Sequence, residues 1–256
     1  NYNNNSFLEN KETLMTNKIK ELLAPKGHLR VGINMSNFLL VVGKDETGNP
    51  IGISPDIAKL IAKKIDVECK FVLFERPGEL ADAVDKDLWD IGNIAYEPER
   101  GNTIDFSNPY VLIDANFLVK DNSNLSKNED IDNLENTIVV ADRSAYDLWL
   151  KSNLKYSKII RVKSINDSHD FYRSGKANIL AGLRPKLIDE ISLNNGDRII
   201  NEPFTFIRQS VGFKKNFPDA INFVNQVISE AISQGYIKES LKKHNVNNKL
   251  SIPELI

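Results

Sequence analysis

The chain has 256 residues, and its 33 lysine and arginine residues nearly balance 35 aspartate and glutamate residues, leaving a formal net charge of -2. This balance argues against a nucleic-acid-binding surface and against a polybasic membrane patch. The single cysteine, Cys69, excludes an internal disulfide and a cysteine-based zinc site, and no apolar run approaches the roughly 20 residues that span a bilayer. We therefore expect no metal, no cofactor and no nucleic-acid partner.

Residues 1–26 form an N-terminal extension with a composition of its own. The asparagine-rich start, Asn1–Ser6, is expected to be disordered. The following residues predict a weakly amphipathic helix with one apolar stripe, made of Leu14, Ile19, Leu22 and Leu23. The extension lacks the basic and apolar segments of an export signal, so we expect any such signal to have been removed.

Beyond Gly27, strand-like and helix-like segments alternate along the chain. A first strand at Leu29–Asn34 leads through a polar turn to a helix with Ser54 as its expected N-cap and Pro55 at its first position. Ile57, Ile61 and Ile65 then repeat every four residues and should face a sheet. This alternation predicts an α/β fold with mostly parallel sheets.

Two extended apolar segments predict that the chain crosses twice between two lobes. The first is Ala115–Val119, and the return is Phe204–Phe213. Lobe 1 would then comprise residues 27–117 and, after the return, residues 212–256 with the C-terminal helices. Lobe 2 would comprise residues 118–211. We expect a two-strand hinge between two mostly parallel sheets.

Arg100 is the first candidate ligand-binding residue. It follows the buried apolar run 88–95 and should lie near the carboxyl end of that strand, where open α/β sheets bind ligands. Its planar guanidinium can hold a carboxylate through two parallel hydrogen bonds. The alternative is an ion pair with Glu97 or Glu99 on the same turn.

A second anion site is predicted where a strand leads directly into a helix, within residues 138–150. Ser144 would cap that helix, and the first amides of the helix are unpaired and carry the positive end of its dipole. Ser144 and its neighbour Arg143 are therefore candidates for contact with a carboxylate that reaches across from Arg100. The alternative is that Ser144 is a structural cap only.

Several segments together resemble the family 3 extracellular solute-binding proteins, the polar amino-acid receptors of ABC importers. Residues 96–110, YEPERGNTIDFSNPY, resemble the family's "T-P-E-R … D-F-S-x-P-Y" signature. Residues 29–34, 48–64 and 211–225 resemble its first strand, its turn and helix, and its second crossover, in family order. The resemblance implies a two-lobed periplasmic-binding-protein fold (type II).

The same resemblance implies a function and its partners. A small carboxylate-bearing solute would bind between the lobes, the lobes would close on it by hinge motion, and an ABC-transporter permease would receive it. Such a receptor would be periplasmic, either free or tethered as a lipoprotein, and we expect a monomer.

The chain departs from the family pattern where amino-acid receptors carry an acidic partner for the ligand ammonium. Gly182, Leu183 or Arg184 occupies the position of the family's aspartate. Asn178 stands where the family has an earlier aspartate. Arg143-Ser144 also replaces the family's Gly-Thr or Gly-Ser pair. With Arg184 and Arg208 expected near Arg100, the sequence favours an anionic ligand. The alternative is that Arg184 and Arg208 face solvent or pair with Asp189, Glu190 or Glu202.

Further contacts are expected from side chains near the ends of two strands. Asn34 and Asn37, with Ser36 and Phe38, follow the first strand, where the family contacts the ligand side chain. Asn93 lies on the strand before Arg100 and is included in the predicted site. Tyr96 would supply an aromatic wall.

An enzyme is the alternative of a different class, because dehydratases of the cyclohexadienyl type share this two-lobed fold. Proton transfer would need a nearby acid or base, and the carboxyl candidates are Glu97, Glu99, Asp142 and Glu202. The three histidines, His28, His169 and His244, are expected far from the strand ends, so we predict no catalysis. A ligand-sensing module of a larger receptor is a third possibility, and a neighbouring permease gene would separate it from an importer receptor.

Overall fold

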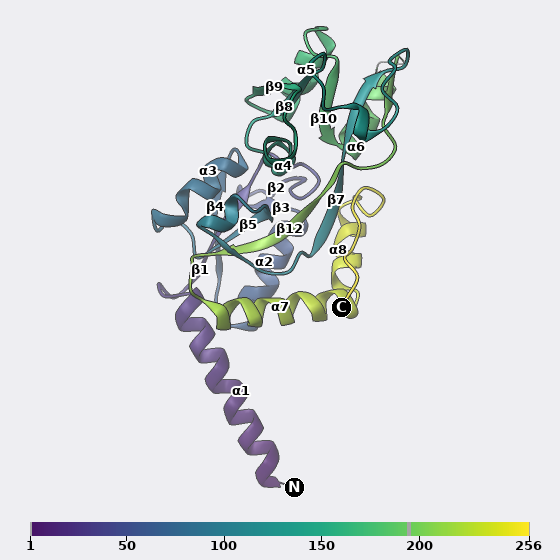
Figure 1. The fold of residues 1–256 in the computed structure, drawn as a ribbon. Helices are drawn as coiled ribbons and strands as arrows, with labels where there is room; N and C mark the ends of the chain where they lie inside the picture. Colours follow the sequence, from purple (N-terminus) through teal and green to yellow (C-terminus); the bar gives the residue numbers. More distant parts are fainter. Residues whose placement is uncertain (1, 194–195, 256) are drawn as a thin grey trace.

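Alternating strands and helices form two α/β lobes in the computed structural model, which describes residues 2–193 and 196–255 (Figure 1). The first lobe contains three parallel strands in the order β4 (Cys69–Phe74), β1 (Leu29–Asn34) and β5 (Ile91–Tyr96). The second lobe contains another three in the order β10 (Ile179–Leu183), β8 (Thr137–Ala141) and β9 (Lys158–Val162). Strands β1, β5 and β10 are buried almost throughout, as expected of parallel strands covered on both faces.

Two long antiparallel strands join the lobes. They are β7 (Val111–Lys120) and β12 (Thr205–Phe213), which pair with each other. On its other edge β12 pairs with β5, and β7 pairs with β10, so ten of the described strands form one continuous mixed sheet, while β2 and β3 pair separately. Both predicted crossovers lie on these strands, and the predicted two-lobed α/β architecture is confirmed.

Helices pack against the sheet in each lobe. Those of the first lobe are α2 (Ile53–Lys64), α3 (Pro77–Asp82), α7 (Pro218–Ser233) and α8 (Tyr236–Lys243). Those of the second lobe are α4 (Ala145–Asn153), α5 (Ile165–Arg173) and α6 (Arg184–Leu193). Four short strands complete the architecture: β2 (Gly43–Lys44), β3 (Pro50–Ile51), β6 (Asp105–Phe106) and β11 (Asp197–Ile199).

The start of α2 differs from the prediction, since its N-cap is Gly52 and not Ser54. Gly52 has a φ of 151°, and a Cβ at this position would lie 2.1 Å from the Leu40 carbonyl oxygen. The close backbone contact therefore requires glycine and begins the helix before Ser54. The expected stripe is present, because Ile57 and Ile61 are fully buried.

The N-terminal extension is helical, which corrects the expectation of disorder for residues 2–6. Helix α1 (Tyr2–Leu23) projects from the first lobe, and the predicted disorder of Asn1 lies outside the described residues (Figure 1). Ile19 and Leu23 are buried where the helix meets the lobe, whereas Leu14 is 69% exposed. The apolar stripe therefore anchors only the C-terminal part of α1.

Two kinds of feature are absent from the part of the chain that the structure describes. None of its helices is long and apolar enough to cross a membrane. Its histidine, cysteine, aspartate and glutamate side chains form no group of three or more that could hold a metal ion.

Candidate functional site

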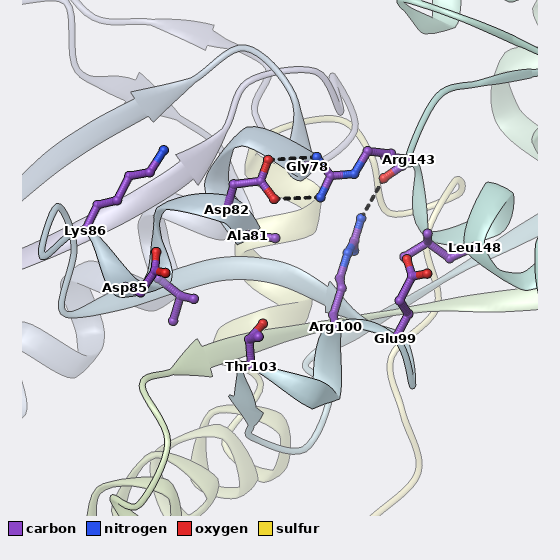
Figure 2. Close-up of a pocket in the computed structure, with 11 residues that line it drawn as sticks. Gly78, Ala81, Asp82, Asp85, Lys86, Glu99, Arg100, Thr103, Arg143 and Leu148 are labelled. Carbon is purple, nitrogen blue, oxygen red and sulfur yellow. Dashed lines mark hydrogen bonds and ion pairs between the residues drawn. The ribbon is translucent and has the colours of Figure 1, made fainter.

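Arg100 lies at the junction of the two lobes. It begins a short 3₁₀ turn (Arg100–Asn102) that follows β5, and only 6% of the residue is exposed. Its Nη1 donates to the Ala95 carbonyl oxygen at 2.9 Å, and its Nη2 donates to the Arg143 carbonyl oxygen at 2.9 Å. Figure 2 shows this guanidinium pointing from the first lobe to the backbone that precedes α4. Arg100 thus contacts both lobes at once.

No carboxylate of the described residues makes a hydrogen bond or ion pair with Arg100. Glu99 is paired instead with Lys151 of the second lobe at 2.7 Å. Glu97 lies close enough to influence Arg100, but burial is the main effect on both groups: it lowers the pKa of Arg100 to about 10 and raises the pKa of Glu97 to about 7. At neutral pH the buried guanidinium therefore stays charged, and its described hydrogen-bond partners are neutral carbonyl groups.

Ser144 caps α4, as the sequence predicts. Its Oγ accepts from the Asp147 amide at 3.1 Å and donates to the Ala141 carbonyl oxygen at 2.8 Å. The hydroxyl proton is therefore already used within the second lobe. The amides of Ala145 and Tyr146 begin the helix and have no acceptor within it, so the positive end of the helix dipole lies beside Arg100.

A small inner cavity of about 40 Å³ lies between Arg100 and the start of α4. That volume holds on the order of two or three water molecules. Asn34, Asn37, Arg100 and Ser144 are the predicted site residues that the structure brings together there. The other lining residues are Ser36, Pro77, Ala95, Ala145, Tyr146, Ile165, Leu183, Ile207 and Gln209.

The two asparagines of this cavity have their side-chain oxygens occupied. The Oδ1 of Asn34 accepts from the Ser36 amide and hydroxyl, and the Oδ1 of Asn37 accepts from the Leu39 amide. These local turns occupy both oxygens and leave the Nδ2 groups as the remaining polar atoms.

Five predicted site residues lie outside the inner cavity, and Arg143 is the one that still lies beside Arg100. Asn93 belongs to the interior of the first lobe, where it donates to the Ser54 carbonyl oxygen and accepts from the Tyr110 hydroxyl. Tyr96 packs edge-on against Phe106 and is 40% exposed. Arg184 donates to Asn201, and Arg208 donates to the Phe206 carbonyl oxygen. The structure therefore leaves one arginine, not three, at the inner cavity.

Arg143 lines a second, outer cavity of about 520 Å³ on the other side of Arg100 (Figure 2). Its guanidinium forms two hydrogen bonds of 2.8 Å with the Asp82 carboxylate, which holds the pKa of Asp82 below its usual range. Arg143 has a positive φ of 57°, a conformation that costs on the order of 1 kcal/mol for a residue with a side chain. Its side chain passes so close to α3 that a Cβ on Gly78 would lie 2.8 Å from its Nη1.

The two lobes touch directly through these charged groups. Two ion pairs join the lobes, Arg143 with Asp82 and Lys151 with Glu99. The hydrogen bond from the Arg100 side chain to the Arg143 carbonyl oxygen also joins them. Lys186 of α6 also lies over the ring of Phe38 at 5.1 Å from its centre. The residue predicted as a ligand contact, Arg143, is thus placed by its side chain in the contact between lobes.

Sequence reasoning missed two polar residues of the inner cavity. Gln209 belongs to the return strand β12, and its position could have been inferred from the burial of alternate residues across the hinge. Tyr146 lies in the first turn of α4, and its hydroxyl has no hydrogen-bond partner among the described residues. Burial raises the pKa of that hydroxyl, against a smaller opposite effect of the neighbouring Ser144 side chain, so it stays neutral even though no hydrogen bond within ordinary geometry reaches it from the described residues.

The profile of the bacterial extracellular solute-binding proteins, family 3, matches residues 29–247 of the chain. The chain belongs to this family. Its relatives include the L-cystine-binding protein TcyJ of Escherichia coli (strain K12), which is 25% identical over 236 residues covering 90% of this chain and 85% of TcyJ. The family fits the two-lobed fold, and its members are extracellular or periplasmic solute-binding proteins.

Solved structures share the fold. The solute receptor for L-cysteine of Neisseria gonorrhoeae superposes with a TM-score of 0.73 at 20% identity, covering 93% of this chain and 99% of that one. The ancestral amino-acid-binding protein AncCDT-1, a precursor of cyclohexadienyl dehydratase, superposes with a TM-score of 0.70 at 23% identity, covering 88% and 98%. These proteins carry amino-acid-binding and dehydratase-related names, whereas their likeness to this chain is one of fold.

Proposed function

We propose that the protein is the solute receptor of an ABC importer and that it captures a small carboxylate-bearing solute, preferably an anionic one, between its two lobes. Arg100 would hold the ligand carboxylate through its guanidinium. The amides at the start of α4 would bind the same group from the second lobe. Closure of the lobes around the ligand would be the state that a permease recognises.

The observation that carries this proposal is the environment of Arg100. A charged guanidinium with 6% exposure has only carbonyl groups as hydrogen-bond partners among the described residues, and no acidic side chain lines the inner cavity. Taking a charge out of water without an opposite charge is unfavourable, so a bound anion would stabilise this arrangement. The dipole of α4 acts in the same direction.

Hinge closure follows from the same geometry. A ligand that contacts Arg100 and α4 makes its full set of contacts only when the lobes are together, and it shifts the equilibrium by that difference in affinity. The two hinge strands allow this motion because the chain passes between the proposed lobes, 27–117 with 212–256 and 118–211, along β7 and β12. The permease partner, the monomeric state and any lipid tether belong to the proposal as well.

The first test is a thermal-shift and calorimetric screen with amino acids, small mono- and dicarboxylates, sulfonates and polyamines. Carboxylates should raise the unfolding midpoint, because a ligand that binds only the native state stabilises it. Arg100→Ala should weaken binding about a hundredfold or more, since it removes a charge-assisted pair of hydrogen bonds. Arg184→Ala is the matched control, because this arginine contacts Asn201 outside the inner cavity.

Two results would contradict the proposal. Equal loss of binding in both arginine variants would show that Arg100 has no special role. Stabilisation by polyamines alone would show that the site prefers cations. Small-angle scattering at saturating ligand should show a smaller radius of gyration, and an unchanged radius would exclude hinge closure.

Among the carboxyl candidates for the dehydratase alternative, Glu97 is the one best suited to proton transfer. Glu97 has the raised pKa of a useful general acid, about 7, but it is not among the residues that line either cavity. Turnover of prephenate-like acids by the wild type, lost in Glu97→Gln, would support an enzyme. We expect no turnover.

A further inference from the structure

The inner cavity has an unusual balance of polar groups. Arg100 is its only charged side chain among the described lining residues, and Asn34, Asn37 and Tyr146 present donors that are not used elsewhere. Leu183, which is 1% exposed, occupies the wall formed by the end of β10. The cavity therefore offers hydrogen-bond donors to a ligand, and its described wall has no carboxylate that could receive an ammonium.

Tyr146 adds a buried hydroxyl to the polar groups of the inner cavity. Its side chain is 3% exposed, lines the cavity from the first turn of α4, and carries a hydroxyl without a partner among the described residues. Ser144 cannot take this role, because its proton already goes to the Ala141 carbonyl oxygen. A buried hydroxyl is stabilised by a partner, and a ligand oxygen at this position would supply one.

We infer that the site selects carboxylates without an ammonium group, such as short oxo or hydroxy acids, and that Tyr146 determines this preference by donating to the ligand's second oxygen. The inference rests on the proposed function, since Arg100 must hold the carboxylate. An α-amino acid of the same skeleton would bring a buried ammonium next to Arg100 and Leu183, with no opposite charge on the described wall. Such a charge is expensive to desolvate, and it would also repel the guanidinium.

The shape of the cavity agrees with a short ligand. About 40 Å³ separates apolar walls formed by Pro77, Ile165 and Ile207. A carboxylate and one further oxygen would fill the polar end, and little space remains for a long side chain while the lobes touch.

The experiment compares matched pairs of compounds by isothermal titration calorimetry. The pairs are pyruvate with L-alanine, glycolate with glycine, and 2-oxoglutarate with L-glutamate. At least one ammonium-free member should bind about tenfold or more tightly than its amino twin, because the site's donors discriminate between oxygen and ammonium. Tyr146→Phe should weaken that binding about three- to tenfold and reduce the difference within the pair.

Tyr172→Phe is the matched control in the same lobe, because the Tyr172 hydroxyl donates to Asp197 away from the cavity. It should leave the preference unchanged, and circular dichroism should show that both variants fold. If an amino acid binds as well as its twin and still requires Arg100, the inference is overturned while the proposed function stands. If no pair binds at all, both are overturned. A loss in Tyr172→Phe equal to that in Tyr146→Phe would remove Tyr146 as the determinant.

Discussion

The two cavities on either side of Arg100 differ in how their charges are satisfied. The outer cavity carries both signs of charge, and the ion pair of Arg143 with Asp82 in its wall joins one lobe to the other. The inner cavity has Arg100 as its single charged lining group among the described residues. Paired charges in the first case can hold the lobes together, whereas the unpaired charge in the second calls for an external anion.

Arg100 and Arg143 have similar positions in the sequence but different partners in the structure. Both Arg100 and Arg143 follow a buried strand of a parallel set. Arg143 is about half exposed and finds a carboxylate in α3, and Arg100 is buried against carbonyl groups. Under the proposed function, closing the lobes and recognising the ligand would therefore fall to different side chains.

The largest expected effect comes from replacing the geometry of Arg100 while keeping its charge. Arg100→Lys should lower carboxylate affinity roughly tenfold to a hundredfold, because an ammonium cannot form two parallel hydrogen bonds. Titration calorimetry would measure the loss. An affinity equal to that of the wild type would mean that a point charge suffices and that the fork geometry is unimportant.

A smaller effect is expected from Glu97, whose folded-state pKa of about 7 lies above its ordinary value because of burial. Its contribution to stability is fully present below about pH 4.5 and is lost as pH rises through 7. Glu97→Gln should therefore gain about 1 kcal/mol relative to the wild type between pH 5 and pH 8, after allowing for solvent screening. Urea unfolding of both proteins at the two pH values would measure this, and a difference independent of pH would contradict it.

The smallest effect concerns the contact between lobes in the outer cavity. Asp82→Asn removes a half-exposed ion pair, which should destabilise the closed form by about 0.5 to 1 kcal/mol and weaken ligand binding two- to fivefold. Scattering without ligand should show a larger radius of gyration than for the wild type. Glu79→Gln is a control, because Glu79 pairs within the first lobe, with Arg76. An identical response of both variants would argue against a closing role for Asp82.

Much of the architecture could be predicted from local patterns. The crossover strands, the helix that Ser144 caps and the place of Arg100 after β5 depend on residues close in sequence, such as Ser144 and Asp147. The start of α2 could not be predicted, because it depends on the Leu40 backbone passing Gly52. The helical start of the N-terminal extension, residues 2–6, was also missed, because asparagine has a low helix propensity.

The candidate site was predictable in part. Asn34, Asn37, Arg100 and Ser144 meet at one cavity because each ends or follows a strand whose carboxyl end faces the other lobe. Arg184 and Arg208 lie elsewhere, although their positions in the sequence suggested the same cavity. Side-chain direction decides such cases, and for a long arginine it depends on distant partners, here Asn201 and the Phe206 carbonyl.

The sequence by itself predicted the α/β class and the arginine on the turn after a buried strand, because periodicity, capping and turn residues act over a few positions. The family and its two-lobed fold were implied by the resemblance of four segments to the family's motifs. Only the tertiary structure decided which charges remain without a partner. Arg143 meets Asp82 across 61 residues of chain, whereas Arg100 reaches the second lobe and finds only its backbone. Charge pairing between lobes depends on distances that the fold creates, and so the sequence alone could not separate the paired arginine from the unpaired one.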